Sequence, residues 1–204
     1  MKEKDLTAVE SLKLIESTIE QSKRDIAKAS AQPLLVWGTL VVATSLTIWG
    51  LMTNTPAGEG ANKWHLLWIL MALIGGVYQY RFNRTWSVPE SIVSKILGSM
   101  WGVFGISVFV LWAMNVCAIT WGGISVKETI PMTPTIILFM GMSVAITGKI
   151  INRLFISIVG AIACAICAYF ALVNQGVNEL LCTAITAVFT LLIPGLYLKF
   201  SNDR

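Results

Sequence analysis

Long apolar stretches alternate with short polar stretches along most of the chain. Lys, Arg, Asp and Glu are missing from six segments, which cover residues 29–58, 64–80, 96–126, 129–148, 154–178 and 180–198. A helix needs about 20 apolar residues to cross the hydrocarbon of a bilayer. The pattern therefore predicts six transmembrane helices, at about 34–53, 64–80, 98–120, 133–149, 154–173 and 180–198.

The composition favours the same class of protein. Hydrophobic residues make up 55% of the chain, charged residues make up 13%, and the mean hydropathy is +0.72. A soluble domain has about 25% charged residues, so this chain has too little charge to cover a water-soluble globule. We expect an all-α integral membrane protein with two parts. Residues 1–32 would form a cytoplasmic or interfacial amphipathic helix, and residues 33–200 a bundle of six helices in three hairpins.

The basic residues predict how the chain is threaded. If the N-terminus is cytoplasmic, all of the 15 Lys and Arg residues except Lys63 and Lys127 lie on the cytoplasmic side. Cytoplasmic segments of membrane proteins carry an excess of Lys and Arg. We therefore expect a multi-pass protein of the inner (cytoplasmic) membrane with both termini in the cytoplasm.

The polar N-terminal segment has the pattern of an amphipathic helix. Thr7 and Glu10 have the spacing of a capping box, which predicts the start of a helix. We expect that helix to end near residue 30 and Pro33 to begin the next one. Apolar residues recur at helical spacing and define a stripe, which consists of Leu12, Ile15, Ile19 and Ile26.

The stripe is the predicted contact surface, and its pattern leaves three occupants open. The helix could lie on the inner leaflet of the bilayer, since amphipathic helices bind there through their apolar face. It could also pair with a second copy of itself, or dock on another cytoplasmic protein. Nothing in the sequence indicates nucleic acid as a partner.

Chemistry-bearing residues are scarce in the predicted spans. None of the spans contains Asp or Glu, although ion-coupled carriers usually hold such groups inside the membrane. Asn115, Thr44 and Thr47 are candidate intramembrane polar contacts, either as hydrogen bonds between helices or as the lining of a cavity. We predict no catalytic residue.

The cysteines and the single histidine predict no metal site and no cofactor. Cys164 and Cys167 fall within one apolar span, where burial suppresses the thiolate that redox and metal chemistry require. Neither Cys117 nor Cys182 has a histidine nearby in the sequence, and His65 stands alone at the start of the second span.

Small residues and one proline predict local packing. Small residues spaced by four allow membrane helices to approach closely. The candidates are Gly98 with Gly102, extended by Gly105, then Gly141 with Ala145, and Ala161 with Ala165. Pro194 is expected to kink the last span.

Three strings, SLKLIESTIEQSKRDIAK (11–28), LLVWGTLV (34–41) and LLIPGLYLK (191–199), carry a resemblance. Through them the chain resembles an uncharacterised family of small six-span inner-membrane proteins of Bacteroidetes-type bacteria. The resemblance implies the topology and transfers no catalytic residue.

Two function classes follow. The first is a membrane-embedded interaction or regulatory protein without catalytic chemistry, whose N-terminal helix binds a partner. The second is a small transporter or channel for an uncharged or apolar solute. A water-wide cavity lined by the Thr, Ser and Asn residues of the spans would favour the second class.

Overall fold

Every regular element in the structure of the chain, a computed structural model, is a helix. The structure describes residues 8–56, 61–85 and 92–201. The prediction of an all-helical chain is thereby confirmed. In these residues, 5 helices are long and apolar enough to cross a membrane.

The helices follow one another with short connections. The chain begins with α1 (Ala8–Asn54), and a 3₁₀ turn η1 (Ala61–Leu66) leads into α2 (Leu67–Thr85). Next come α3 (Ile92–Thr120), a 3₁₀ turn η2 (Val126–Glu128), α4 (Met132–Ile150) and α5 (Leu154–Val173). The final rod consists of α6 (Glu179–Ala187), a π-helical turn η3 (Val188–Leu192) and α7 (Ile193–Ser201).

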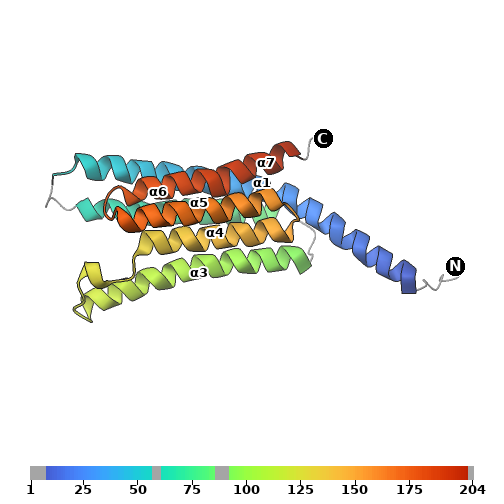
Figure 1. Ribbon diagram of the computed structural model, residues 1–204, viewed down its shortest axis with the longest axis horizontal. Coiled ribbons are helices and arrows are strands. Elements are labelled where there is room, and N and C mark those ends of the chain that lie inside the picture. The colour runs from blue at the N-terminus through green and yellow to red at the C-terminus, as the bar shows by residue number, and fades with distance from the viewer. Residues whose placement is uncertain (1–7, 57–60, 86–91, 202–204) are drawn as a thin grey trace.

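The helices lie roughly antiparallel in one bundle. The start of α1 and the end of α7 lie at the same end of it (Figure 1). The helices apolar enough to span a membrane are α1, α3, α4, α5 and the rod from α6 to α7. Helix α2 runs beside them but is outside this group, because its last two turns carry polar and charged residues such as Gln79, Arg81 and Arg84.

Helix α1 is much longer than a membrane crossing requires. It contains 47 residues, which corresponds to a length of about 70 Å at the usual rise. The hydrocarbon core of a bilayer is only about 30 Å thick. The first part of α1 extends beyond the other helices, at an angle to the rest of α1 (Figure 1). We call residues 8–25 the arm.

The helix break that we predicted near residue 30 is absent. Helix α1 passes through Pro33 without interruption, although a proline lacks the N–H that would bond the carbonyl of Ala29. Packing on both sides of the proline accounts for this, since Ile26 and Leu34 belong to the same buried cluster. Thr7, the predicted N-cap, lies outside the described residues.

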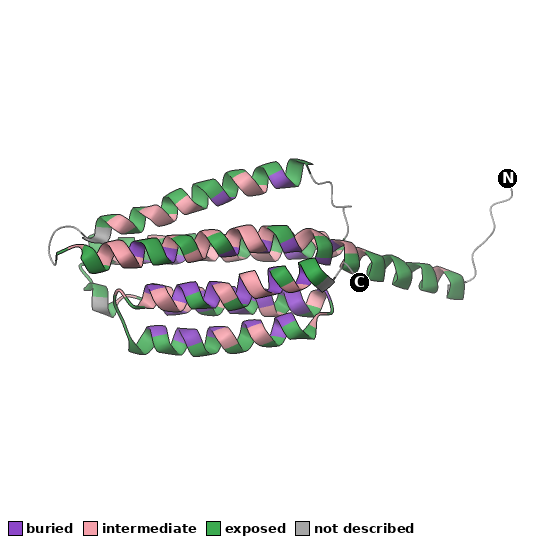
Figure 2. Cartoon of the chain, turned by 90° about the horizontal axis from the view of Figure 1, so that it is seen from above, coloured by how far each residue is buried: buried purple, intermediate pink, exposed green. Residues whose placement is uncertain are grey.

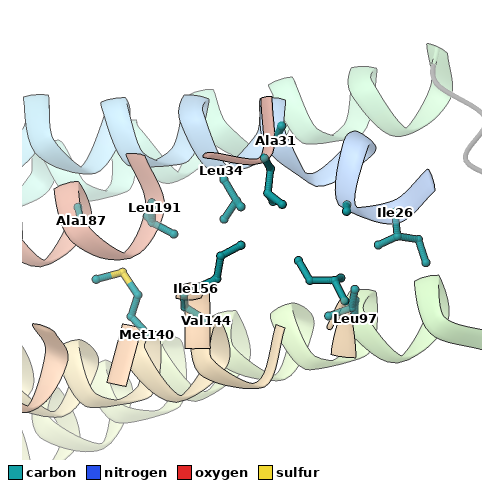
Figure 3. Packing of buried hydrophobic residues seen from close by; sticks show 12 residues of the cluster. Ile26, Ala31, Leu34, Leu97, Met140, Val144, Ile156, Ala187 and Leu191 are labelled. Carbon is teal, nitrogen blue, oxygen red and sulfur yellow. The ribbon is translucent and has the colours of Figure 1, made fainter. Parts of the chain in front are cut away.

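The main core lies where α1 faces the other helices. Figure 3 shows Ile26, Leu34, Val144, Ile156 and further residues of this cluster, contributed by α1, α3, α4, α5 and the final rod. Burial is concentrated in α4, α5 and the final rod, whereas the arm is exposed almost throughout (Figure 2). The arm is therefore the part of the chain that its own fold covers least.

Helices α4 and α5 form the closest helix pair, and glycine makes the approach possible. A Cβ added to Gly148 would lie 2.5 Å from the backbone nitrogen of Ser157. A Cβ added to Gly141 would overlap the Cys164 side chain. The Ser157 hydroxyl donates a hydrogen bond of 2.8 Å to the carbonyl oxygen of Ala145 across the same contact.

The other predicted small-residue pairs do not serve as helix contacts. A Cβ added to Gly98, Gly102 or Gly105 would meet nothing within 4 Å, and both Ala161 and Ala165 are exposed. The spacing of small residues identified three faces, and only the face of Gly141 packs against another helix.

The turn from α4 to α5 closes through a left-handed asparagine. Asn152 has a φ of 58°, and its N–H donates to the Lys149 carbonyl at 3.2 Å. The next N–H, of Arg153, donates to the Gly148 carbonyl at 2.7 Å. These two bonds form a Schellman motif, which satisfies the last carbonyls of a helix.

The final rod contains a π-helical turn directly before Pro194. Pro194 cannot donate to the carbonyl four residues earlier, and its ring crowds that carbonyl. A π turn is one of the local distortions by which a helix accommodates such a break. The Ile193 N–H accordingly bonds the carbonyl of Val188, five residues back.

Candidate interaction surface

The apolar stripe lies partly on the arm and partly in the bundle. Leu12, Ile15 and Ile19 are 66%, 56% and 44% exposed, whereas Ile26 is 5% exposed and belongs to the main core. The fold thus covers one of the four predicted contact residues and leaves the other three on the surface of the arm.

Several polar side chains of the arm form hydrogen bonds within the arm. The hydroxyls of Ser17 and Thr18 both donate to the Leu14 carbonyl, at 2.9 and 2.7 Å. The Lys23 ammonium bonds the Glu20 carboxylate at 2.8 Å. This hydrogen bond and the lysine charge lower the pKa of Glu20 below its ordinary value. The exposed apolar side chains are therefore one candidate contact surface of the arm, beside its exposed charged residues.

The arm extends from the bundle as the first part of helix α1. A helix that lies on a bilayer needs its axis in the membrane plane. The arm belongs to α1 but lies at an angle to the rest of that helix, and it leads away from the other helices (Figure 1). The angle is compatible with either lipid or protein as the occupant of the stripe.

Two of the predicted intramembrane polar residues line a groove between α1 and α2. Thr44 and Thr47 stand beside apolar residues of both helices in a shallow depression of about 160 Å³; its lining is completed by Leu40, Ala43, Leu67, Leu70, Met71 and Ile74. The groove opens outward, and its lining is almost wholly apolar. It therefore fits an apolar chain from the surrounding lipid better than a hydrated solute.

The third predicted polar residue, Asn115, ties α3 to the start of α4. Its side-chain amide donates a hydrogen bond of 2.9 Å to the carbonyl oxygen of Ile130. Ile130 directly precedes Pro131, which is the N-cap residue of α4. Asn115 is buried, so this bond satisfies a group that would otherwise be costly in an apolar region.

The remaining buried hydroxyls are mostly satisfied within their own helices. Thr147, Thr186 and Thr190 each donate to the carbonyl four residues back, at 2.8 Å. The hydroxyl of Ser45 is buried without a hydrogen-bond partner. These residues do not form a hydrated passage among the described helices.

The cysteines sit in apolar surroundings. Cys164 and Cys167 are buried in a second small cluster with Ile137, Ala168 and Ala171, and Cys182 packs against it. In the described part of the chain, no group of three or more His, Cys, Asp or Glu residues could hold a metal ion. Cys164, Cys167 and Cys182 therefore serve as small packing residues between helices.

Sequence reasoning missed the hydrogen bonds that two tryptophans form with polar residues of distant segments. The indole N–H of Trp37 donates to the side-chain oxygen of Gln79 at 3.2 Å, which joins α1 to α2. The Trp37 ring fills the space that a Cβ on Gly75 would need. Trp49 likewise reaches Asn178 at 3.4 Å. No local sequence pattern specifies these partners.

Comparison of the chain with family models, curated proteins and solved structures finds no match. The chain can be assigned to the class of helical membrane proteins through its apolar helices. Its function has to be inferred from the residues and geometry above.

Proposed function

We propose that this chain is a multi-pass protein of the inner (cytoplasmic) membrane, with six transmembrane helices and both termini in the cytoplasm. The position of the chain's first and last helical turns at one end of the bundle supports an even number of crossings (Figure 1). Basic residues near helix ends support the orientation, since Arg84, Lys149 and Lys199 all lie in last turns that point to this end.

The topology can be tested with reporters fused to the chain. Alkaline phosphatase, which works only in the periplasm, should be inactive when fused after Arg204 and active when inserted after Pro56. A C-terminal fusion that is active only in the periplasm would contradict an even number of spans.

Within this topology, the proposed function is protein interaction or regulation without catalytic chemistry. The observation that carries it is the exposed stripe of Leu12, Ile15 and Ile19 on an arm that continues a spanning helix. Exposed apolar patches on parts of a protein that meet water mark interaction sites. In the proposed orientation the arm projects into the cytoplasm, so its stripe is available there.

Site-specific photocrosslinking from the arm tests this function. A photoreactive amino acid at Ile15 or Ile19 should give protein adducts in intact cells, while the same group at Ser17, on the polar side, should not. Equal adducts from both sides, or adducts with lipid alone, would contradict the proposal.

The groove beside Thr44 and Thr47 supports the alternative, a small transporter for an uncharged or apolar solute. Purified protein in liposomes should then move such a solute, and bulky residues at Thr44 and Thr47 should block the movement. Absence of flux with intact arm adducts would favour the interaction protein.

A further inference from the structure

We propose that the arm pairs with the arm of a second copy of this chain, as a parallel two-stranded coiled coil. This inference rests on the proposed function, because it names the partner of the same stripe. It starts from the spacing of the stripe along α1.

The spacing of the stripe is that of a coiled-coil seam. Leu12, Ile15, Ile19, Ser22 and Ile26 follow one another at intervals of three and four residues. Leu12, Ile19 and Ile26 take position a of a heptad, and Ile15 and Ser22 take position d. A helix that docks on a broad protein surface usually carries a wider apolar face, so the narrow seam favours another helix with the same seam.

The residues beside the seam set the number of strands. Within the arm, position e carries Val9, Glu16 and Lys23, and position g carries Ser11, Thr18 and Asp25. All of these except Val9 are polar, and assemblies of more than two strands would bring more of them into contact. In a parallel pair in register, residue g of one strand faces residue e of the next heptad on the other. Thr18 then faces Lys23 of the other copy, and Ser11 faces Glu16, so no like charges meet.

The fold sets the direction and register of the two strands. Each arm continues α1 without a break, so two copies inserted in one membrane with the same orientation present their arms in the same direction. Identical stripes then meet at the same height above the bilayer, as a two-fold symmetric interface requires. An unrelated soluble partner has no such constraint.

The structure also defines where the pairing stops. Ile26 continues the seam, but it is buried in the chain's own core beside Leu97 (Figure 3). The free seam therefore spans Leu12 to Ser22, and the copies separate where each arm enters its bundle. A free helix of this length is marginal in water, but α1 supplies the helix already formed, and confinement to one membrane raises the effective concentration of the second arm.

The chain offers a matched control within the arm. Leu14 is 57% exposed and Ile15 is 56% exposed, but Leu14 occupies position c on the other side of the helix. Replacement of Leu14 or of Ile15 by the same residue would place the same new side chain on an equally exposed site. Only the substitution at Ile15 alters the seam.

Co-purification of differently tagged full-length copies from one membrane tests the proposal. Wild-type copies should co-purify, Ile15→Asp with Ile19→Asp should abolish this, and Leu14→Asp should leave it unchanged. Oxidation of membranes should give a disulfide-linked dimer with Ile15→Cys and none beyond the wild-type background with Leu14→Cys. Correct folding of each variant is checked by its elution volume and its pattern of limited proteolysis.

Several outcomes would overturn the pairing. They are co-purification that survives the double substitution, equal loss with Leu14→Asp, and equal crosslinking from Leu14→Cys and Ile15→Cys. A photoreactive group at Ile15 separates this failure from failure of the proposed function. Adducts only with a different protein would reject the second copy and retain the interaction function, whereas adducts only with lipid would reject both.

Discussion

Replacement of Gly148 by alanine probes how closely α4 and α5 are packed. The new Cβ would lie 2.5 Å from the Ser157 nitrogen and 3.1 Å from the Arg153 carbonyl oxygen, and ordinary contact begins near 3.4 Å. Both neighbours are backbone atoms, which cannot rotate aside as a flexible side chain can. The two helices must therefore separate by several tenths of an ångström or more.

The expected change in the free energy of unfolding combines two destabilising contributions and one stabilising contribution. Overpacking of a rigid site costs about 1–3 kcal/mol, and here the rigid backbone favours the upper half of that range. Separation of the helices also stretches the hydrogen bond from Ser157 to Ala145, which measures 2.8 Å and contributes about 1 kcal/mol. Alanine gains roughly 0.5–1 kcal/mol over glycine in a helix. We expect the Gly148→Ala variant to be destabilised by about 2–3 kcal/mol, as these contributions imply.

Gly102→Ala is the matched control, because a Cβ there meets nothing within 4 Å. This variant should be as stable as the wild type or more stable by up to about 1 kcal/mol. Tryptophan fluorescence in mixed micelles of mild detergent and dodecyl sulfate gives the free energy of unfolding of each variant. If the two variants unfold at the same detergent composition, the close packing of α4 on α5 is refuted.

The same unfolding assay checks three further predictions. Asn152→Val should lose about 1–2 kcal/mol, since a β-branched residue fits the left-handed conformation poorly, while Asn152→Gly should retain full stability; equal losses would contradict the turn geometry. Asn115→Leu should lose about 1–3 kcal/mol because it leaves the Ile130 carbonyl without its donor, and unchanged stability would remove that hydrogen bond from the account. Ser157→Ala should lose about 1 kcal/mol with its hydrogen bond, whereas Ser45→Ala should lose nothing, because the Ser45 hydroxyl has no partner; the reverse order would show that these assignments are wrong.

The sequence was sufficient for features that depend on each residue alone. Charged residues are too costly to leave in hydrocarbon, so gaps between charges located apolar helices such as α5, which covers Leu154–Val173. The spacing likewise defined a stripe, but it could not show that Ile26 is buried in the chain's own core while Leu12, Ile15 and Ile19 are exposed. The spacing of small residues identified the face of Gly141, which packs closely against α5, but only as one of three candidate faces.

The features that the sequence could not specify depend on contacts between distant residues. Continuity through Pro33 follows from packing of Ile26 and Leu34 into one cluster, and that packing outweighs the local preference of proline. The bond from Trp37 to Gln79 joins residues 42 positions apart. Which glycine face meets another helix is also a property of the assembled bundle, because spacing gives a face and not its neighbour.

Pro33 interrupts the hydrogen-bond ladder of α1 within the part of the helix that packs in the bundle. The carbonyl of Ala29 has no N–H donor from residue 33, so bending there breaks no hydrogen bond that a regular helix would have at that position. Farther along α1, Gly38 packs against Leu191 and Leu192, which holds the spanning part of the helix against the final rod. A bend of α1 at Pro33 would move residues 8–32 relative to the part of the helix that Gly38 anchors. Since the bundle begins to bury α1 at Ile26, before the proline, a change in arm angle must also disturb the core around Ile26.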